Sequence, residues 1–193
     1  MRCFVGIGLS DSLAENLTNA CETIARTDER WRDEKWTAPA NLHITLAFLG
    51  SVPDSDVAML EERLGHLFAN QPPCELSFRR LTAVPNTRRC SMVWAEFLDP
   101  SGVCEQLAAG AAAVGAEFGA RAETRRFVPH VTLVRSRRTK PLDPHALERG
   151  ALPLADGSPV MSVLSATLFS STLTRHGPVY EALRTWPLSQ RKG

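Results

Sequence analysis

The 193-residue sequence has almost no excess of charge of either sign, no paired cysteine motif and no long hydrophobic run. A net charge of +1 gives no whole-molecule attraction to nucleic acid, so any basic surface must be local. The five cysteines are odd in number, widely spaced and free of any CxxC pair, which favours reduced thiols over a disulfide framework or a zinc site. The opening MRCFVGIGLS is too short an apolar run for a signal peptide, and no stretch approaches a membrane span. We therefore expect a cytoplasmic protein with no membrane partner.

Length and composition are ordinary for a globular protein, with 44% hydrophobic and 22% charged residues. A chain of 193 residues can form one domain with a sizeable core, or one domain built of two halves. We interpret residues 1–193 as a single two-lobed domain and expect it to be a monomer.

Two short stretches stand out, His43-Ile44-Thr45-Leu46 and His130-Val131-Thr132-Leu133. Each has the composition of a buried strand, yet each carries an imidazole and, two residues later, a threonine hydroxyl. Side chains at i and i+2 of a strand point to the same face. The pattern therefore predicts two polar His/Thr pairs on strands whose other face is core.

Hydrophobic periodicity predicts strands and helices along the rest of the chain. Strands are expected at residues 2–9, 74–84, 90–97 and 160–173, and in the tail from Val179. Helices are expected around Leu13–Ile24, Val57–Phe68 and Val103–Phe118, with a short helical piece after Asp143. Ser12 followed by Glu15 fits a capping box for the first helix, and residues 31–40 are expected to form a polar loop.

An internal repeat links the two histidine strands. A shift of 87 residues superimposes Arg2-Cys3 on Arg89-Cys90, and His43-Ile44-Thr45 on His130-Val131-Thr132. The same predicted order of elements thus occurs twice, namely strand, helix, loop and histidine strand, as expected for an ancient duplication. Two such lobes related by an approximate twofold axis would bring both His/Thr pairs to a shared groove.

Two imidazoles facing one groove suit the cleavage of a phosphodiester. With pKa values near ~6.5, one imidazole can accept a proton from the attacking oxygen while the other gives one to the leaving oxygen. Threonine hydroxyls can donate to the non-bridging oxygens, where charge accumulates. This scheme requires no metal or other cofactor, and no His or Cys pair has metal-ligand spacing.

HITLAFLG and PHVTLVR resemble the paired HxTx signatures of the two-histidine phosphoesterase superfamily, in particular its RNA 2′,3′-cyclic phosphodiesterase (2′-5′ RNA ligase-like) branch. The resemblance also covers RCFVGIGLS at the start and GPVYEALRTWPL at the end. It implies a bilobal α/β or α+β fold, with two pseudo-twofold-related β-α-β lobes whose sheets face a central cleft. It also implies hydrolysis of RNA 2′,3′-cyclic phosphate ends to 2′-phosphomonoesters, with reversible 2′-5′ joining as a further activity.

By motif position, the resemblance implies that His43 is the proton donor and His130 the proton acceptor. Thr45 and Thr132 take the place of the family's phosphate-binding hydroxyls. An arginine shortly after the second motif corresponds to Arg135. Simple strand parity points Arg135 away from His130, so a bulge or the end of the strand must redirect it.

A basic cluster surrounds the second motif, with Glu123 as its one opposing charge. It comprises Arg121, Arg125, Arg126, Arg135, Arg137, Arg138 and Lys140. We expect Arg125, Arg126, Arg137 and Arg138 to contact RNA beside the phosphate site, although a solvated surface is the ordinary interpretation of such a run. Phe48, Trp31 and Trp36 are candidates for stacking a base, with core packing as the alternative.

Three functional interpretations stay open: an enzyme for RNA 2′,3′-cyclic phosphate ends, a phosphodiesterase for a small cyclic nucleotide or phosphorylated metabolite, and a non-catalytic RNA-binding module. The intact pair of HxT motifs argues against the module, because a binder has no need of two titrating groups. The basic cluster favours a polynucleotide. His66, His145 and His176 have no such companions, and we expect them to be solvated or structural.

Overall fold

The computed structural model describes residues 1–121, 123–152, 160–175 and 177–189. Its strands form one eight-stranded sheet in the order β6-β3-β4-β5-β2-β1-β7-β8. The strands are β1 (Arg2–Gly8), β2 (His43–Ser51), β3 (Cys74–Val84), β4 (Cys90–Leu98), β5 (His130–Lys140), β6 (Val160–Val163), β7 (Ser165–Thr174) and β8 (Gly177–Pro187). All neighbouring strands run antiparallel.

The sheet is built from two halves that meet at β2 and β5. Ile44 of β2 pairs with Val131 of β5, and these residues are themselves related by the 87-residue shift. Three strands extend on either side of this central pair. The predicted duplication is thus matched by an approximate symmetry of the sheet, and the bilobal α+β fold class is confirmed.

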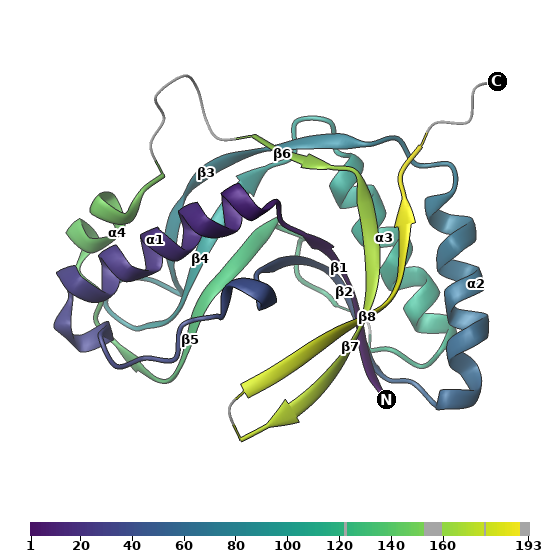
Figure 1. Cartoon of the computed structure of the whole chain (residues 1–193), viewed down its shortest axis with the longest axis horizontal. Coiled ribbons are helices and arrows are strands. Elements are labelled where there is room, and N and C mark those ends of the chain that lie inside the picture. Colours follow the sequence, from purple (N-terminus) through teal and green to yellow (C-terminus); the bar gives the residue numbers. More distant parts are fainter. Residues whose placement is uncertain (122, 153–159, 176, 190–193) are drawn as a thin grey trace.

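The helices cover the two halves in separate groups. They are α1 (Asp11–Thr27), α2 (Val57–Phe68), α3 (Val103–Glu117) and α4 (Pro144–Gly150), with short 3₁₀ turns η1 (Glu29–Trp31), η2 (Pro39–Asn41) and η3 (Asp54–Asp56). Figure 1 shows α1 and α4 at the end of the molecule where β3, β4 and β5 lie, and α2 and α3 at the other end.

Helices α1 and α3 are exchanged between the two halves. Each packs on the half that does not contain the strand preceding it. Helix α1 follows β1, yet it packs against α4, whose Gly150 lies against Ile24 of α1 and Leu81 of β3. Helix α3 follows β4, yet its Gly115 lies against Leu49 of β2. This exchange ties the two halves into one body.

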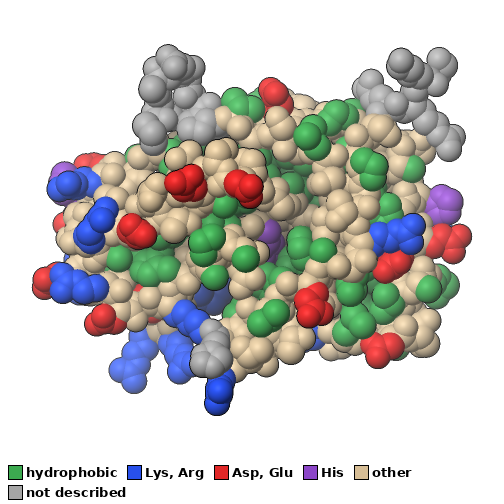
Figure 2. All heavy atoms as spheres, viewed as in Figure 1, with side chains coloured by type: hydrophobic (Ala, Val, Ile, Leu, Met, Phe, Trp, Pro, Cys, Tyr) green, Lys and Arg blue, Asp and Glu red, His purple; other side chains and the backbone are tan. Residues whose placement is uncertain are grey.

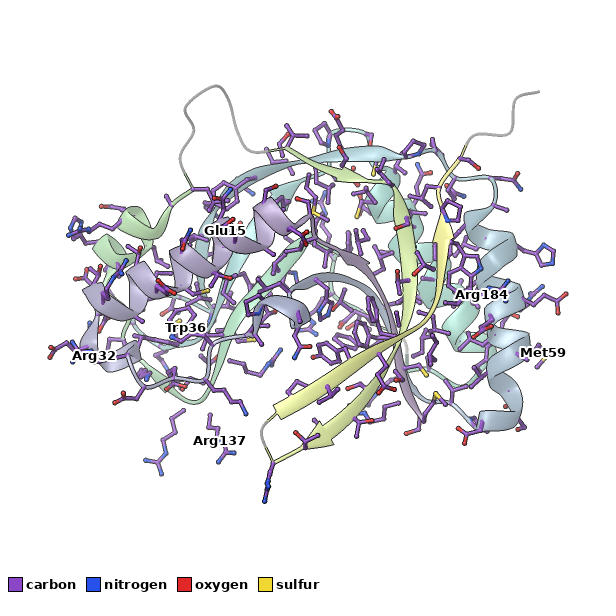
Figure 3. All side chains as sticks on the ribbon, in the orientation of Figure 1. Glu15, Arg32, Trp36, Met59, Arg137 and Arg184 are labelled. Carbon is purple, nitrogen blue, oxygen red and sulfur yellow. The ribbon has the colours of Figure 1, made fainter. Side chains whose placement is uncertain are left out.

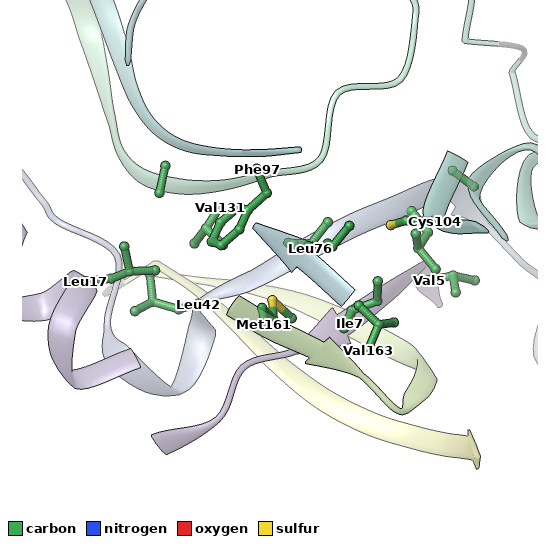
Figure 4. Close-up of a cluster of buried hydrophobic side chains, with 14 of the residues drawn as sticks. Val5, Ile7, Leu17, Leu42, Leu76, Phe97, Cys104, Val131, Met161 and Val163 are labelled. Carbon is green, nitrogen blue, oxygen red and sulfur yellow. The ribbon is translucent and has the colours of Figure 1, made fainter. Parts of the chain in front are cut away.

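The core lies between the helices and the sheet. Val5, Ile44 and Val131 are fully buried, and Leu76, Met161 and Val163 bring the sheet edge into the same cluster (Figure 4). Alternation along each strand sends these side chains to the helix side. The opposite face of the central strands is left for polar and aromatic side chains.

Three local expectations are corrected by the structure. The helix α1 begins with Ser10 as its N-cap, whose side chain accepts from the Leu13 amide at 3.3 Å, so Ser12 is not the cap. The predicted strand 160–173 is two strands, because β6 pairs with β3 while β7 pairs with β1 and β8. The connecting residue Leu164 is 63% exposed, which marks the point where the chain leaves one half for the other.

The third correction concerns the loop before β2, which the sequence predicts to be polar. The Trp31 side chain at its start is fully buried, and its Nε1 donates to the Pro141 carbonyl at 2.9 Å. Trp31 is therefore a core residue and does not stack a base. No helix in the described part of the chain is long and apolar enough to span a membrane.

Candidate active site

The two predicted histidines emerge from the first residues of β2 and β5, the strands that meet at the centre of the sheet. Ile44 and Val131 point into the core, so their neighbours His43, Thr45, His130 and Thr132 lie on the opposite face. Because Ile44 pairs with Val131, each histidine lies next to this central pair on that face of the sheet. This arrangement supports the sequence prediction that the two pairs converge.

Each imidazole is held by the backbone in the same way. The Nδ1 of His43 lies 2.7 Å from the carbonyl oxygen of Asn41, and the Nδ1 of His130 lies 2.7 Å from that of Val128. In both cases the partner is two residues upstream, and Asn41 and Val128 are themselves 87 residues apart. A carbonyl can only accept, so Nδ1 carries the proton in both rings and Nε2 is the atom that can exchange one.

The threonine beside His43 completes its hydrogen bonding. Thr45 Oγ1 lies 3.0 Å from His43 Nε2, and it donates to that nitrogen when the ring is neutral. Thr132 is half-buried on the same face as His130, and its carbonyl accepts from the Thr37 hydroxyl at 2.9 Å. Each threonine thus shares the face of the histidine two residues before it.

A pair of β-bulges sets the direction of the side chains that follow. Along β5, Val134 pairs with Val93 and Thr132 with Trp94, so Leu133 is an extra residue. Along β2, Leu46 is the extra residue between Thr45 and Ala47. A bulge inverts the alternation beyond it. Leu133 and Val134 are accordingly both buried, and Arg135 is exposed on the face of His130.

The equivalent bulge of β2 places Phe48 on the face of His43. Phe48 lies 87 residues before Arg135, so the two occupy equivalent positions in the two halves. Its side chain is 71% exposed, and its ring centroid is 6.3 Å from that of Phe4. The two halves thus present an aromatic ring on one side and a guanidinium on the other.

Aromatic rings that the sequence pattern does not single out surround His43. The centroid of Phe4 is 4.8 Å from that of His43, and Tyr180 meets the ring edge-on at 5.2 Å. Phe169 stacks on Phe4 at 5.0 Å. These residues come from β1, β7 and β8, so only the strand order brings them together. The one available signal was that Tyr180 is the single tyrosine of the chain.

The surroundings of His130 are different in kind. Trp94 stacks on the imidazole with centroids 3.8 Å apart. Glu96, which pairs with His130 across β4 and β5, is buried and accepts from Arg80 Nε at 2.9 Å. Neither Trp94 nor Glu96 was predicted as a site residue. A charged residue, Glu96, inside the mostly apolar strand 90–97 was the signal that could have found the second.

Burial lowers the pKa of both histidines below the ordinary imidazole value. The hydrogen bond to the Asn41 carbonyl opposes this at His43, and the one to Val128 opposes it at His130. Glu96 also raises the pKa of His130, whereas Arg135 and Arg125 lower it. Burial raises the pKa of the Tyr180 phenol, and the charge of Arg135 counters that effect.

The predicted basic residues lie in the segment before β5 and along the second half of β5. Arg126, Arg137 and Arg138 are exposed, and Figure 3 shows Arg137 projecting from the molecule. Figure 2 shows Lys and Arg side chains collected along the lower left of this face, and a hollow near its middle with a histidine side chain inside. Arg125 is exposed but bonded to Glu123, whose pKa it lowers to about 2.

Other predicted candidates have structural surroundings. Lys140 binds Glu34 and lies over the Trp31 ring, and Trp36 is half-buried with its Nε1 donating to the Trp31 carbonyl at 3.2 Å. His66 and His145 are exposed on helices beside Glu62 and Glu148, and His176 lies outside the described residues. Within the described residues, no group of three or more His, Cys, Asp or Glu side chains could hold a metal ion.

Known proteins are similar to this chain over nearly its full length. An RNA 2′,3′-cyclic phosphodiesterase of Aquifex aeolicus is 26% identical over 189 residues, which cover 97% of both chains. The crystal structure of TT0787 of Thermus thermophilus is 25% identical with a TM-score of 0.78, over 99% of this chain and 100% of the other. That of Escherichia coli LigT complexed with 3′-AMP is 25% identical with a TM-score of 0.69, over 98% of both.

The model of the LigT like Phosphoesterase family matches residues 7–94 and 98–180, which include both histidine motifs. The chain belongs to the LigT-like phosphoesterase family.

Proposed function

We propose that this protein is an RNA 2′,3′-cyclic phosphodiesterase that hydrolyses a ribose 2′,3′-cyclic phosphate to a 2′-phosphomonoester. The observation that carries the proposal is the pair of imidazoles at equivalent positions of β2 and β5, each fixed by a 2.7 Å contact from Nδ1 to a backbone carbonyl. The name of the Aquifex relative and the 3′-AMP bound to the E. coli structure support a nucleotide substrate.

In the proposed reaction, His130 Nε2 takes a proton from the attacking water as its oxygen bonds to phosphorus. The bond between phosphorus and the ribose 3′ oxygen breaks, and His43 Nε2 gives its proton to that oxygen. The product keeps the phosphate on the 2′ oxygen. Each ring has one free nitrogen for this purpose because its other nitrogen donates to the backbone.

The non-bridging oxygens gain charge as the bonds change, and three side chains are proposed to stabilise it. Thr45 and Thr132 donate their hydroxyls, and Arg135 supplies a guanidinium from the same face of β5. The bulge at Leu133 supports the assignment of Arg135, because without it the side chain would point to the helices. Donors fixed before the reaction need no rearrangement when the charge develops.

The RNA beyond the cyclic end is proposed to contact Phe48 and the exposed arginines Arg125, Arg126, Arg137 and Arg138. Phe48 offers an exposed ring for a base, and the exposed arginines flank the second motif in the sequence. If they bind the backbone, the affinity of an oligonucleotide should fall more steeply with salt than that of cyclic CMP. Equal salt slopes would remove the arginines from the proposal.

The central test replaces each histidine separately by alanine. His43→Ala and His130→Ala should each lose about 10²–10⁴-fold in kcat/KM on cyclic CMP, the range that a general acid or base contributes. His66→Ala, which changes an exposed histidine on α2, is the control and should match the wild type. Near-wild-type rates in either first variant would refute the acid–base assignment.

The alternative substrate class is a small cyclic nucleotide or phosphorylated metabolite. The pairing of Arg125 with Glu123, which occupies part of the basic cluster, favours this alternative. Three substrates discriminate between the classes when they are offered with EDTA present. They are cyclic CMP, a short RNA with a cyclic end and an ADP-ribose-type ester. A clear preference for the RNA supports the first proposal, whereas turnover of the metabolite alone supports the second, and binding without turnover of any supports a non-catalytic module. Reverse 2′-5′ joining is scored after an RNA with a free 5′ hydroxyl is added as the attacking group.

We further propose that residues 1–193 act as one monomeric unit in the cytoplasm. The continuous sheet and the exchanged helices support a single unit. A sedimentation mass of twice 21.2 kDa at assay concentration would argue against the monomer.

A further inference from the structure

The approximate symmetry of the sheet breaks beside the two histidines. Both rings are anchored identically through Nδ1, and both lie next to an aromatic side chain. The residue that pairs with His43 on the neighbouring strand is Gly8 of β1, whereas the residue that pairs with His130 is Glu96 of β4. One imidazole thus has a carboxylate as its cross-strand neighbour, and the other has no side chain there at all.

Glu96 shares the face of His130. Its neighbours Ala95 and Phe97 are in the core, with Ala95 fully buried, and residues opposed across an antiparallel pair project to the same face. Glu96 itself is 7% exposed, and it accepts from Arg80, whose side chain is 56% exposed. Burying a carboxylate costs free energy unless its surroundings compensate for it. A positive charge on His130 would supply further compensation.

The charges that face His130 come from four segments of the chain. Glu96 lies on β4, Arg135 on β5 itself, Arg125 on the segment before β5, and His43 on β2. Among these groups, only Glu96 is an anion, and it favours the protonated form of His130, which the two arginines oppose. The near neighbours of His43 are the rings of Phe4, Phe169 and Tyr180.

We propose that Glu96 is a positioning residue whose buried carboxylate, opposite His130 across β4 and β5, stabilises the imidazolium that forms when His130 accepts the proton of the attacking water. The proposal rests on the acid–base pair of the proposed function and deepens it. During hydrolysis, His130 becomes an imidazolium as it deprotonates the water, and the Glu96 carboxylate stabilises that cation.

The test compares Glu96→Gln with Glu117→Gln. Both glutamates accept from an arginine Nε through Oε2 at 2.9 Å, but Glu117 lies on α3 and binds Arg63. In Glu96→Gln, the titration midpoint of His130 followed by NMR should move to lower pH while that of His43 changes less. The kcat/KM value should fall by roughly 10-fold, short of the ~10²–10⁴-fold loss of a missing general base. Glu117→Gln should leave both midpoints and the rate unchanged.

Two further variants guard against a merely structural effect. Arg80→Gln frees Glu96 from its cation, so the His130 midpoint should move to higher pH, opposite in sign to Glu96→Gln. Glu96→Asp keeps the negative charge, so the titration midpoint of His130 in this variant should lie close to that of the wild type. If His130 titrates identically in the wild type, Glu96→Gln and Arg80→Gln, the proposal is overturned even when His43→Ala and His130→Ala are inactive. If those alanine variants are active, the proposed function fails independently, because the NMR midpoints are measured without substrate.

Discussion

The bulge at Leu133 gives a sharp prediction about Arg135. Replacing Arg135 by methionine keeps much of the length of the side chain but removes its charge and its donors. The side chain is exposed in the free protein, so this change leaves no buried group without a partner. We therefore expect the midpoint of thermal unfolding to stay near that of the wild type, while catalysis is impaired.

The size of the effect follows from the contact that the guanidinium would make. A hydrogen bond to a charged group contributes about 1.5–3 kcal/mol. At about 1.36 kcal/mol for each factor of ten, this range corresponds to a loss of roughly 10- to 150-fold in kcat/KM. Arg135 also lowers the pKa of His130. In the pH dependence of the rate, the limb that reports the ionisation of His130 should therefore shift to higher pH in Arg135→Met.

Initial rates on cyclic CMP between pH 5 and 8.5 measure both effects. Arg137→Met is the matched control, because Arg137 is also an exposed arginine of β5 but lies two residues further from His130. It should retain the wild-type rate on this mononucleotide. A loss below twofold in Arg135→Met, or equal losses in both variants, would refute the argument that the bulge directs Arg135 to the phosphate.

Three other outcomes are expected. Thr45→Val removes the hydroxyl 3.0 Å from His43 Nε2 and should cost about 10²–10³-fold in kcat on cyclic CMP, as for other lost transition-state donors; an unchanged kcat would exclude that role. Because burial lowers the pKa of His43 and His130 in the folded state, the unfolded chain binds more protons as the pH falls below ~6.5. The free energy of unfolding in urea should therefore drop between pH 7.5 and 5, and less so in a His43→Gln, His130→Gln double variant; parallel curves would contradict this. All five cysteines are free and buried, and burial raises the pKa of Cys21 to about 12 and that of Cys74 to about 11. A thiol reagent should thus react slowly with the native protein and completely after unfolding, and rapid native labelling would count against this burial.

The local sequence determined the strands that carry the histidines and the face on which they lie. Strict alternation of Leu42, Ile44 and Leu46 with His43 and Thr45 permits only one orientation once one face is core. The 87-residue shift likewise predicted that both motifs would occupy equivalent places. These features depend on the neighbours along the chain, so a single sequence contains them.

The tertiary structure decided what surrounds each histidine. Phe4 and Tyr180 reach His43 from strands that are distant in sequence, and Glu96 reaches His130 through the register of β4 with β5. The exchange of α1 and α3 between the halves and the split of residues 160–173 into two strands also depend on long-range pairing. The direction of Arg135 also depends on pairing, because simple alternation along β5 would point this side chain away from His130 and only the bulge at Leu133 redirects it. Periodicity records which side of a strand is buried, whereas pairing between distant strands fixes which charges and rings meet there.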